Sequence, residues 1–126
     1  MFIDIDGSGP VEITATLYTL SLYEQEFGGD LIKDVFGRHT KDEADEEVLI
    51  DMTTNNWNAE IKALWAMVKT AADLKDERGD LAPNDRVPSF KKWRKTVGKI
   101  NVREIADAVV EEALDGFFHT GAAVSE

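Results

Sequence analysis

The chain opens with hydrophobic and polar residues in a pattern typical of β-strands. The hydrophobic residues of segment 2–5 precede a glycine-rich stretch at 6–10, and in segment 11–16 hydrophobic and polar residues alternate. Alternation with a period of two on both sides of such a turn predicts a β-hairpin. Because an isolated hairpin is only marginally stable in water, a helix or a third strand is expected to cover it.

Helical periodicity begins directly after the hairpin. Hydrophobic residues at i, i+3 and i+7 predict a helix over 17–27 that ends at the Gly28-Gly29 pair. A short helix is expected over 30–36, with Asp30 as its N-cap. The strongest periodicity predicts a core helix over 57–75 with a solvated back formed by Lys62, Lys69 and Asp73; its hydrophobic stripe consists of Trp57, Ile61, Leu64, Trp65, Val68, Ala71 and Ala72.

Two further helices are predicted in the last third of the chain. Residues 76–88 hold two prolines, a glycine and six charges, which is typical of an exposed connection. Ser89 is the expected N-cap of a short helix that ends at Gly98. Asn101 and Glu104 have the spacing of a capping box for the last helix. The hydrophobic stripe of that helix consists of Val102, Ile105, Ala106, Val109, Val110, Ala113 and Phe117, with Gly116 near its end.

Strands at one end of the chain followed by helices predict an α+β fold that is predominantly helical. Segment 37–47 is a charged loop, and Val48–Ile50 is either a short third strand or the first turn of a helix. We therefore expect an N-terminal β-hairpin, with or without a third short strand, packed against four or five helices. The 126 residues are predicted to form a single domain over 1–126, with a disordered tail at about 119–126.

Composition excludes several kinds of chemistry. The chain has no cysteine, so it has no disulfides, iron–sulfur clusters, cysteine-ligated zinc or thiol catalysis. It has 25 acidic and 14 basic residues, and its net charge of −11 argues against binding to nucleic acids or anionic membranes. The N-terminus has no features of a signal peptide, and no apolar stretch approaches membrane-spanning length. We expect a cytoplasmic protein.

Metal-binding and catalytic motifs find little support. Segment 4–9 begins like a calcium-binding loop, but Ala15 stands where that loop needs a bidentate glutamate. His39 and His119 lie 80 residues apart, and neither has a second ligand at metal spacing. No nucleophile-elbow, dinucleotide or phosphate motif is present. We therefore expect no metal, no cofactor and no enzymatic activity.

The charge is distributed unevenly along the chain. Arg86–Arg103 holds seven of the 14 basic residues and no acidic residue, whereas Glu24–Asp51 holds ten acidic residues and three basic ones. Both segments are either solvated surfaces or complementary surfaces through which copies of the chain form a homo-oligomer. A third interpretation is single-stranded nucleic-acid binding through 91–95, where Trp93 lies among cations. The negative net charge disfavours this last interpretation.

Two pairs of hydrophobic residues fall outside the main helical stripes. Tyr18 and Leu22 are four residues apart on the first helix, and Leu114 and Phe118 are four apart on the last. Together they provide more apolar faces than a small bundle needs. This surplus favours an oligomer or a bound partner.

The order of these elements resembles the tail assembly chaperones of long-tailed (siphovirus-type) bacteriophages and prophages. After the hairpin come an aromatic-rich helix ending in EQEFGG (24–29) and a central tryptophan helix, NWNAEIKALWAMVKTAAD (56–73). The chain then continues as VPSFKKWRKTVGKINVREIADAVVEEAL (87–114). The resemblance covers most of residues 10–118, rests on the order of elements rather than on an invariant motif, and is broken by the acidic stretch at 37–51.

The resemblance implies a non-enzymatic role in phage tail morphogenesis. Members of the family bind the long helical tape measure protein, help to recruit tail tube subunits in the bacterial cytoplasm, and are absent from the mature virion. Apolar contacts would then involve Tyr18, Leu22, Leu114 and Phe118, and charged steering would involve Lys91, Lys92, Arg94 and Lys95. Two alternatives stay open: an acidic adaptor or inhibitor of a basic protein, and a small nucleic-acid-binding protein.

Overall fold

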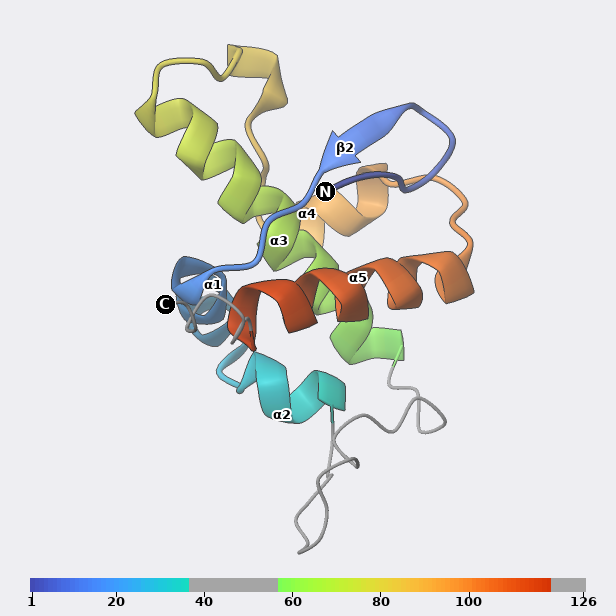
Figure 1. Ribbon diagram of the computed structural model, residues 1–126. Helices are drawn as coiled ribbons and strands as arrows, with labels where there is room; N and C mark the ends of the chain where they lie inside the picture. The colour runs from blue at the N-terminus through green and yellow to red at the C-terminus, as the bar shows by residue number, and fades with distance from the viewer. Residues whose placement is uncertain (37–56, 119–126) are drawn as a thin grey trace, which may run out of the picture.

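The computed structural model describes residues 1–36 and 57–118 (Figure 1). The predicted loop at 37–47, the strand or helical turn at 48–50 and the tail at 119–126 lie outside the described residues, as do both histidines. Within them the fold is α+β and predominantly helical, as predicted. The elements are β1 (Phe2–Asp4), β2 (Pro10–Glu12), α1 (Leu17–Phe27), α2 (Leu31–Phe36), α3 (Trp57–Glu77), the 3-10 turn η2 (Pro83–Asp85), α4 (Phe90–Thr96) and α5 (Val102–Phe117).

The predicted hairpin is confirmed, with shorter strands than the alternation indicated. β1 and β2 pair antiparallel with Ile3 opposite Val11. The turn between them uses Gly7 and Gly9 at φ values of 85° and 121°, where only glycine is unstrained. Just beyond β2 the Ile13 amide still donates to the Met1 carbonyl at 2.8 Å, and the next amide, that of Thr14, donates to the Met67 carbonyl of α3 at 3.2 Å. Backbone pairing with the first strand segment therefore reaches residue 13, after which the chain packs on α3.

α1 and α2 begin and end where local signals predicted. Gly28 adopts a left-handed conformation with φ of 73° and ends α1. The Asp30 carboxylate accepts the amides of Ile32 and Lys33 at 3.0 and 3.2 Å, which confirms it as the cap of α2. The cap of α1 was not predicted: Thr16 and Thr19 exchange side-chain and backbone hydrogen bonds in a capping box.

α3 lies at the centre of the fold and contacts α1, α2, α4, α5 and β2 (Figure 1). Its predicted stripe is buried or half-buried except for Trp57, but Ala63, Ala66 and Met67, outside that stripe, are also fully buried. The prediction of one buried face and one solvated back is therefore wrong. Lys62, Lys69 and Asp73 are half-buried, because neighbours pack on several sides of the helix.

The two last helices are fixed by different caps. Asn101 accepts the Glu104 amide at 3.2 Å and caps α5, as predicted. Ser89 occupies the N-cap position of α4 but makes no side-chain cap hydrogen bond. Instead, a carboxylate oxygen of Glu26 on α1 accepts the Phe90 amide at 3.3 Å. The predicted stripe of α5 is buried at its centre, and one hydrophobic core joins residues from Ile5 to Ala113.

Candidate interaction surface

The cations of α4 lie on the protein surface. Phe90 and Trp93 turn towards the core, whereas all four predicted steering residues are exposed, namely Lys91, Lys92, Arg94 and Lys95. Among residues 1–36 and 57–118, ion pairs are formed by Lys69, Lys75, Arg78 and Arg86, and none involves α4. The charges of α4 are therefore not neutralised by neighbouring carboxylates in the described part of the chain.

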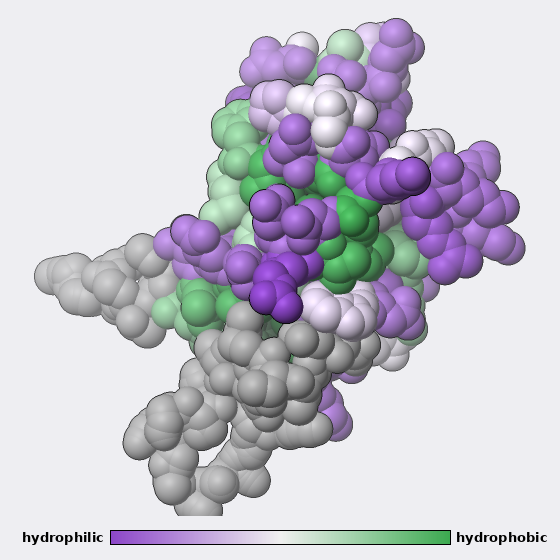
Figure 2. All heavy atoms as spheres, turned by 90° about the vertical axis from the view of Figure 1, so that its right-hand side faces the viewer, coloured by the Kyte–Doolittle hydropathy of each residue, from purple (hydrophilic) through white to green (hydrophobic). Residues whose placement is uncertain are grey.

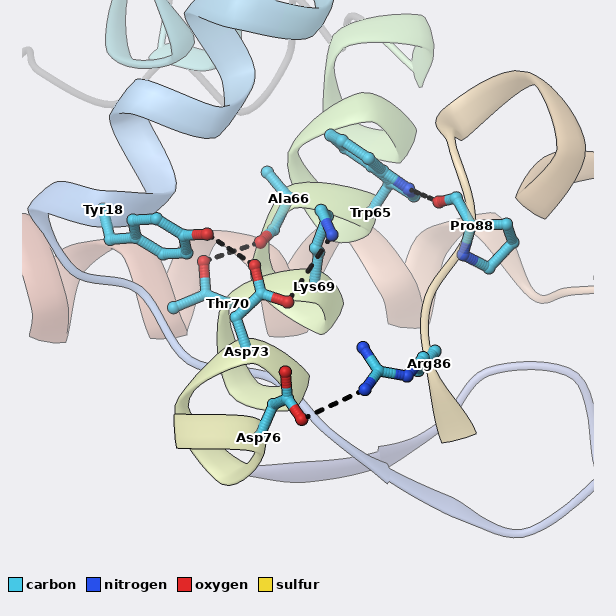
Figure 3. A network of polar contacts seen from close by, with 9 residues as sticks. All are labelled: Tyr18, Trp65, Ala66, Lys69, Thr70, Asp73, Asp76, Arg86 and Pro88. Atoms are coloured by element: carbon cyan, nitrogen blue, oxygen red, sulfur yellow. Dashed lines mark hydrogen bonds and ion pairs between the residues drawn. The ribbon is translucent and has the colours of Figure 1, made fainter. Parts of the chain in front are cut away.

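α4 is held in place by aromatic rings and one buried donor. The Phe90 ring meets Phe27 edge-on, with centroids 5.0 Å apart at 85°. Trp65 of α3 lies 6.2 Å from the same ring, and its indole nitrogen donates to the Pro88 carbonyl at 2.9 Å (Figure 3). Such edge-to-face pairs contribute about 0.5–1.5 kcal/mol each beyond burial. The position of the basic helix is thus set by core contacts.

Trp93 belongs to this buried aromatic cluster. Its side chain is only 8% exposed, and its ring lies 6.2 Å from Phe90. A base could stack on Trp93 only if the ring left the core. The interpretation of 91–95 as a stacking site for single-stranded nucleic acid is therefore wrong in its aromatic part, although the exposed cations remain.

Two cations lie over rings of the cluster. The Arg94 guanidinium carbon is 5.5 Å from the Phe90 centroid, and the Lys62 nitrogen is 5.1 Å from the Phe27 centroid. Both distances are within the range of cation–π attraction. These contacts limit the movement of each side chain while keeping its charge near the surface.

A small apolar hollow of about 100 Å³ lies between α3, α4 and residues 97–100. Figure 2 shows the side of the molecule on which the connection between α4 and α5 runs, with hydrophobic residues gathered between hydrophilic ones. Arg94 and Gly98 complete a wall that otherwise consists of hydrophobic side chains: Ile5, Ile61, Leu64, Trp93, Val97 and Ile100. No local pattern in the sequence predicts this hollow, because its residues come from three separate parts of the chain: Ile5, 61–64 and 93–100.

The four residues predicted to make apolar contacts do not form one surface. Leu22 is 7% exposed and belongs to the core, so its assignment to a partner surface is wrong: the α1 face that carries it is covered. Leu114 is half-buried and packs against the same core. Tyr18 and Phe118 remain 43% and 44% exposed, but they contact different elements.

Tyr18 is tied to α3 through its hydroxyl group. The hydroxyl donates to Asp73 at 2.5 Å, and Lys69 pairs with the same carboxylate at 3.5 Å (Figure 3). The hydrogen bond to Asp73, followed by burial, raises the pKa of Tyr18 to about 12. The Phe118 ring instead meets Phe36 of α2 edge-on, at 5.7 Å. Both side chains are therefore partly committed to contacts within the chain.

Three exposed hydrophobic residues were missed. Phe2 and Leu17 are 64% and 80% exposed, and Trp57 at the start of α3 is also exposed. Phe2 lines an open groove of about 560 Å³ between the hairpin, the end of α3 and segment 80–88. Leu17 is the first residue of α1, and this position at the end of the helix was the one signal for its exposure in the sequence.

In the described part of the chain, four buried polar side chains were also not predicted: Thr19, Glu60, Thr70 and Glu112. The hydroxyls of Thr19 and Thr70 lie 2.7 Å apart and join α1 to α3. Glu112 on α5 accepts the Ala15 amide at 3.1 Å. Glu60 is 4% exposed, and its Oε1 has no hydrogen-bond partner within residues 1–36 and 57–118. Burial, together with the charge of Asp107, raises the pKa of Glu60.

The carboxylates of the glycine-rich turn have structural roles. Asp4 accepts the Gly7 amide at 2.7 Å, and Asp6 accepts the amides of Ser8 and Gly98 at 3.1 and 2.9 Å. These bonds order the turn and tie it to the segment after α4. Within residues 1–36 and 57–118, no group of three or more acidic or histidine side chains is placed to hold a metal ion.

In the part of the chain that the structure describes, no helix combines the length and apolar character needed to cross a membrane. Comparison with protein-family models, curated proteins and solved structures found no match for this chain.

Proposed function

We propose that this protein is a non-enzymatic tail assembly chaperone of a long-tailed bacteriophage or prophage. In this role it binds the tape measure protein and helps to recruit tail tube subunits during tail assembly. It acts in the cytoplasm of the host bacterium and is absent from the mature virion.

The observation that carries the proposal is the order of elements behind the resemblance. The structure contains each element of that order. These are the hairpin, the aromatic helix α1 ended by Gly28, the central tryptophan helix α3, the basic helix α4 and the amphipathic helix α5. The folded chain thus keeps the pattern on which the resemblance rests.

The surface is compatible with a chaperone for a long helical protein. Exposed hydrophobic residues offer contacts to an apolar stripe, and among the described residues the most exposed of them are Phe2 and Leu17. The net charge of −11 favours solubility of the chain together with a bound client. A small helical domain with both properties can cover an aggregation-prone segment while the complex remains dispersed.

Co-expression with the tape measure protein of the same genome tests the proposal. We expect the tape measure protein to be insoluble alone, and soluble and co-purified when the chain is present. An insoluble tape measure protein that never co-purifies would contradict the proposal. Co-purification with one small basic protein instead would favour the adaptor or inhibitor alternative. Gene order supplies an independent check, since a tail tube gene and a very long tape measure gene should lie nearby.

A further inference from the structure

We propose that the hollow beside α4 and the cations at its rim bind an acidic amphipathic segment of a partner protein. One large hydrophobic side chain of the segment fills the hollow, and aspartate or glutamate residues on either side of it meet the cations. The inference rests on the proposed function in one respect: the segment is expected to belong to the tape measure protein.

The hollow is preformed by side chains of the core. Leu64 is fully buried, and Ile5 and Trp93 are also buried, so the floor cannot easily rearrange. Its volume of about 100 Å³ suits one side chain. Small-molecule and cofactor sites are several times larger, at roughly 300–1,000 Å³. A rigid apolar floor lowers the ordering cost of binding, which favours insertion of an anchor residue.

The rim of the hollow is basic in a chain that is otherwise acidic. Trp93 and Arg94 of α4 line the hollow together with Val97, the C-cap residue of that helix. Lys99, which follows the wall residue Gly98, is exposed. Segment 86–103 contains no acidic residue although the chain carries a net charge of −11. Asp6 also reaches this rim, where its carboxylate accepts the Gly98 amide at 2.9 Å and adds one negative charge. Arg94 and Lys99 outnumber it, and a net positive charge around an apolar hollow favours a partner with carboxylates around an apolar residue.

The larger groove beside Phe2 does not select a partner by charge in this way. Charged residues of both signs line it, and they pair with nearby side chains: Lys75 with Glu12 at 3.3 Å, and Arg86 with Asp76 at 3.4 Å. The charges of the groove therefore favour neither an acidic nor a basic partner. The hollow at α4 combines an apolar floor with cations that form no ion pair within the described residues.

The test uses the full chain and fluorescent 20-residue peptides that tile the tape measure protein of the same genome. Binding is followed by fluorescence anisotropy, and the intact proteins are compared by co-purification. The first variant, Arg94→Gln with Lys99→Gln, removes both cations from the rim. Its matched control, Lys92→Gln with Lys95→Gln, removes the same charge from the side of α4 away from Val97. A third variant, Val97→Phe, fills the hollow and keeps every charge.

We expect the bound peptides to carry a hydrophobic residue flanked by acidic ones. Removing both cations from the rim should weaken their binding about tenfold or more, as loss of a central anchor contact does. Filling the hollow should weaken it to a similar extent, and the control by no more than about threefold, because distant charges mainly alter the rate of association. Thermal unfolding followed by circular dichroism identifies any variant that has not folded, and the other variants then decide the result.

Each contrary outcome has a distinct meaning. If the wild-type chain binds neither the tape measure protein nor its peptides, both proposals are overturned. If it binds but the rim and hollow variants bind equally well, or if the bound peptides are basic, the inference alone fails. If the variants change only the mass measured by light scattering, the surface is an interface between copies of this chain, which also overturns the inference.

Discussion

Replacement of Gly116 by alanine tests how closely the C-terminal end of α5 packs against the segment between β2 and α1. A Cβ atom at position 116 would lie 2.7 Å from the Cβ of Ala15, 2.8 Å from its carbonyl carbon, and closer still to its carbonyl oxygen. Normal carbon contacts are about 3.5–4.0 Å, so the two segments would have to separate by roughly 1 Å. Neither side of the contact is a flexible side-chain end that could move aside.

The separation would also strain a buried hydrogen bond. Glu112 lies one turn before Gly116 on α5 and accepts the Ala15 amide at 3.1 Å. Overpacking costs about 1–3 kcal/mol, and a weakened buried hydrogen bond costs a further 1–3 kcal/mol. Alanine in a helix recovers about 1 kcal/mol relative to glycine. Taken together, these magnitudes lead us to expect Gly116→Ala to lower the free energy of unfolding by about 1–5 kcal/mol.

Urea unfolding followed by tryptophan fluorescence measures this change. Gly98→Ala is the matched control, because its new Cβ would lie 3.6 Å from the Asp6 carboxylate, an ordinary contact, and its amide would keep its hydrogen bond. The control should change the free energy of unfolding by less than about 0.5 kcal/mol. A Gly116→Ala protein as stable as the control would refute the close packing of α5 on Ala15.

Four further predictions concern buried polar groups, a tyrosine and self-association. Glu60→Gln should stabilise the fold at neutral pH, because the folded-state pKa of Glu60 is raised and its buried charge therefore lowers the stability of the wild-type protein. In urea unfolding the stability difference between variant and wild type should shrink as the pH falls, because protonation of Glu60 removes that charge. Thr70→Val should cost about 1–2 kcal/mol in the same assay, since its hydroxyl donates to the Ala66 carbonyl at 2.7 Å and bonds Thr19. Ultraviolet titration should find the pKa of Tyr18 at about 12, and Asp73→Asn should move it back towards 10.0; an unchanged value would contradict the tie to α3. If complementary charges join copies of the chain, light scattering should show an oligomer that dissociates with salt, and a monomer at every salt and protein concentration would exclude it.

Local signals determined most element boundaries. Gly28 ends α1, Asp30 caps α2 and Asn101 caps α5, because each of these residues acts on backbone groups within three or four positions of itself. The glycine-rich turn similarly predicted the hairpin. α4 is different: Ser89, its expected cap, accepts no amide with its side chain, and the first amide of the helix, that of Phe90, donates to Glu26, 64 residues away.

Periodicity alone could not say how many neighbours a helix has. The pattern of α3 marked one apolar face, but alanines such as Ala63 and Ala66 are small enough for other elements to approach on further sides. For the same reason Leu22 and Trp93, which the sequence left available to partners, are core residues. Burial depends on what packs opposite a residue, and the sequence around that residue does not contain this information.

The candidate interaction surface was likewise predicted in part from the sequence and completed only by the tertiary structure. The sequence by itself located the exposed cations of α4, because charges on a short helix whose aromatic residues face inward remain solvated. Only the tertiary structure placed Ile5, Ile61 and Val97 around one hollow beside them. Contacts between segments so distant along the chain arise only when α3, α4 and the hairpin pack together, so no local pattern of residues could predict them.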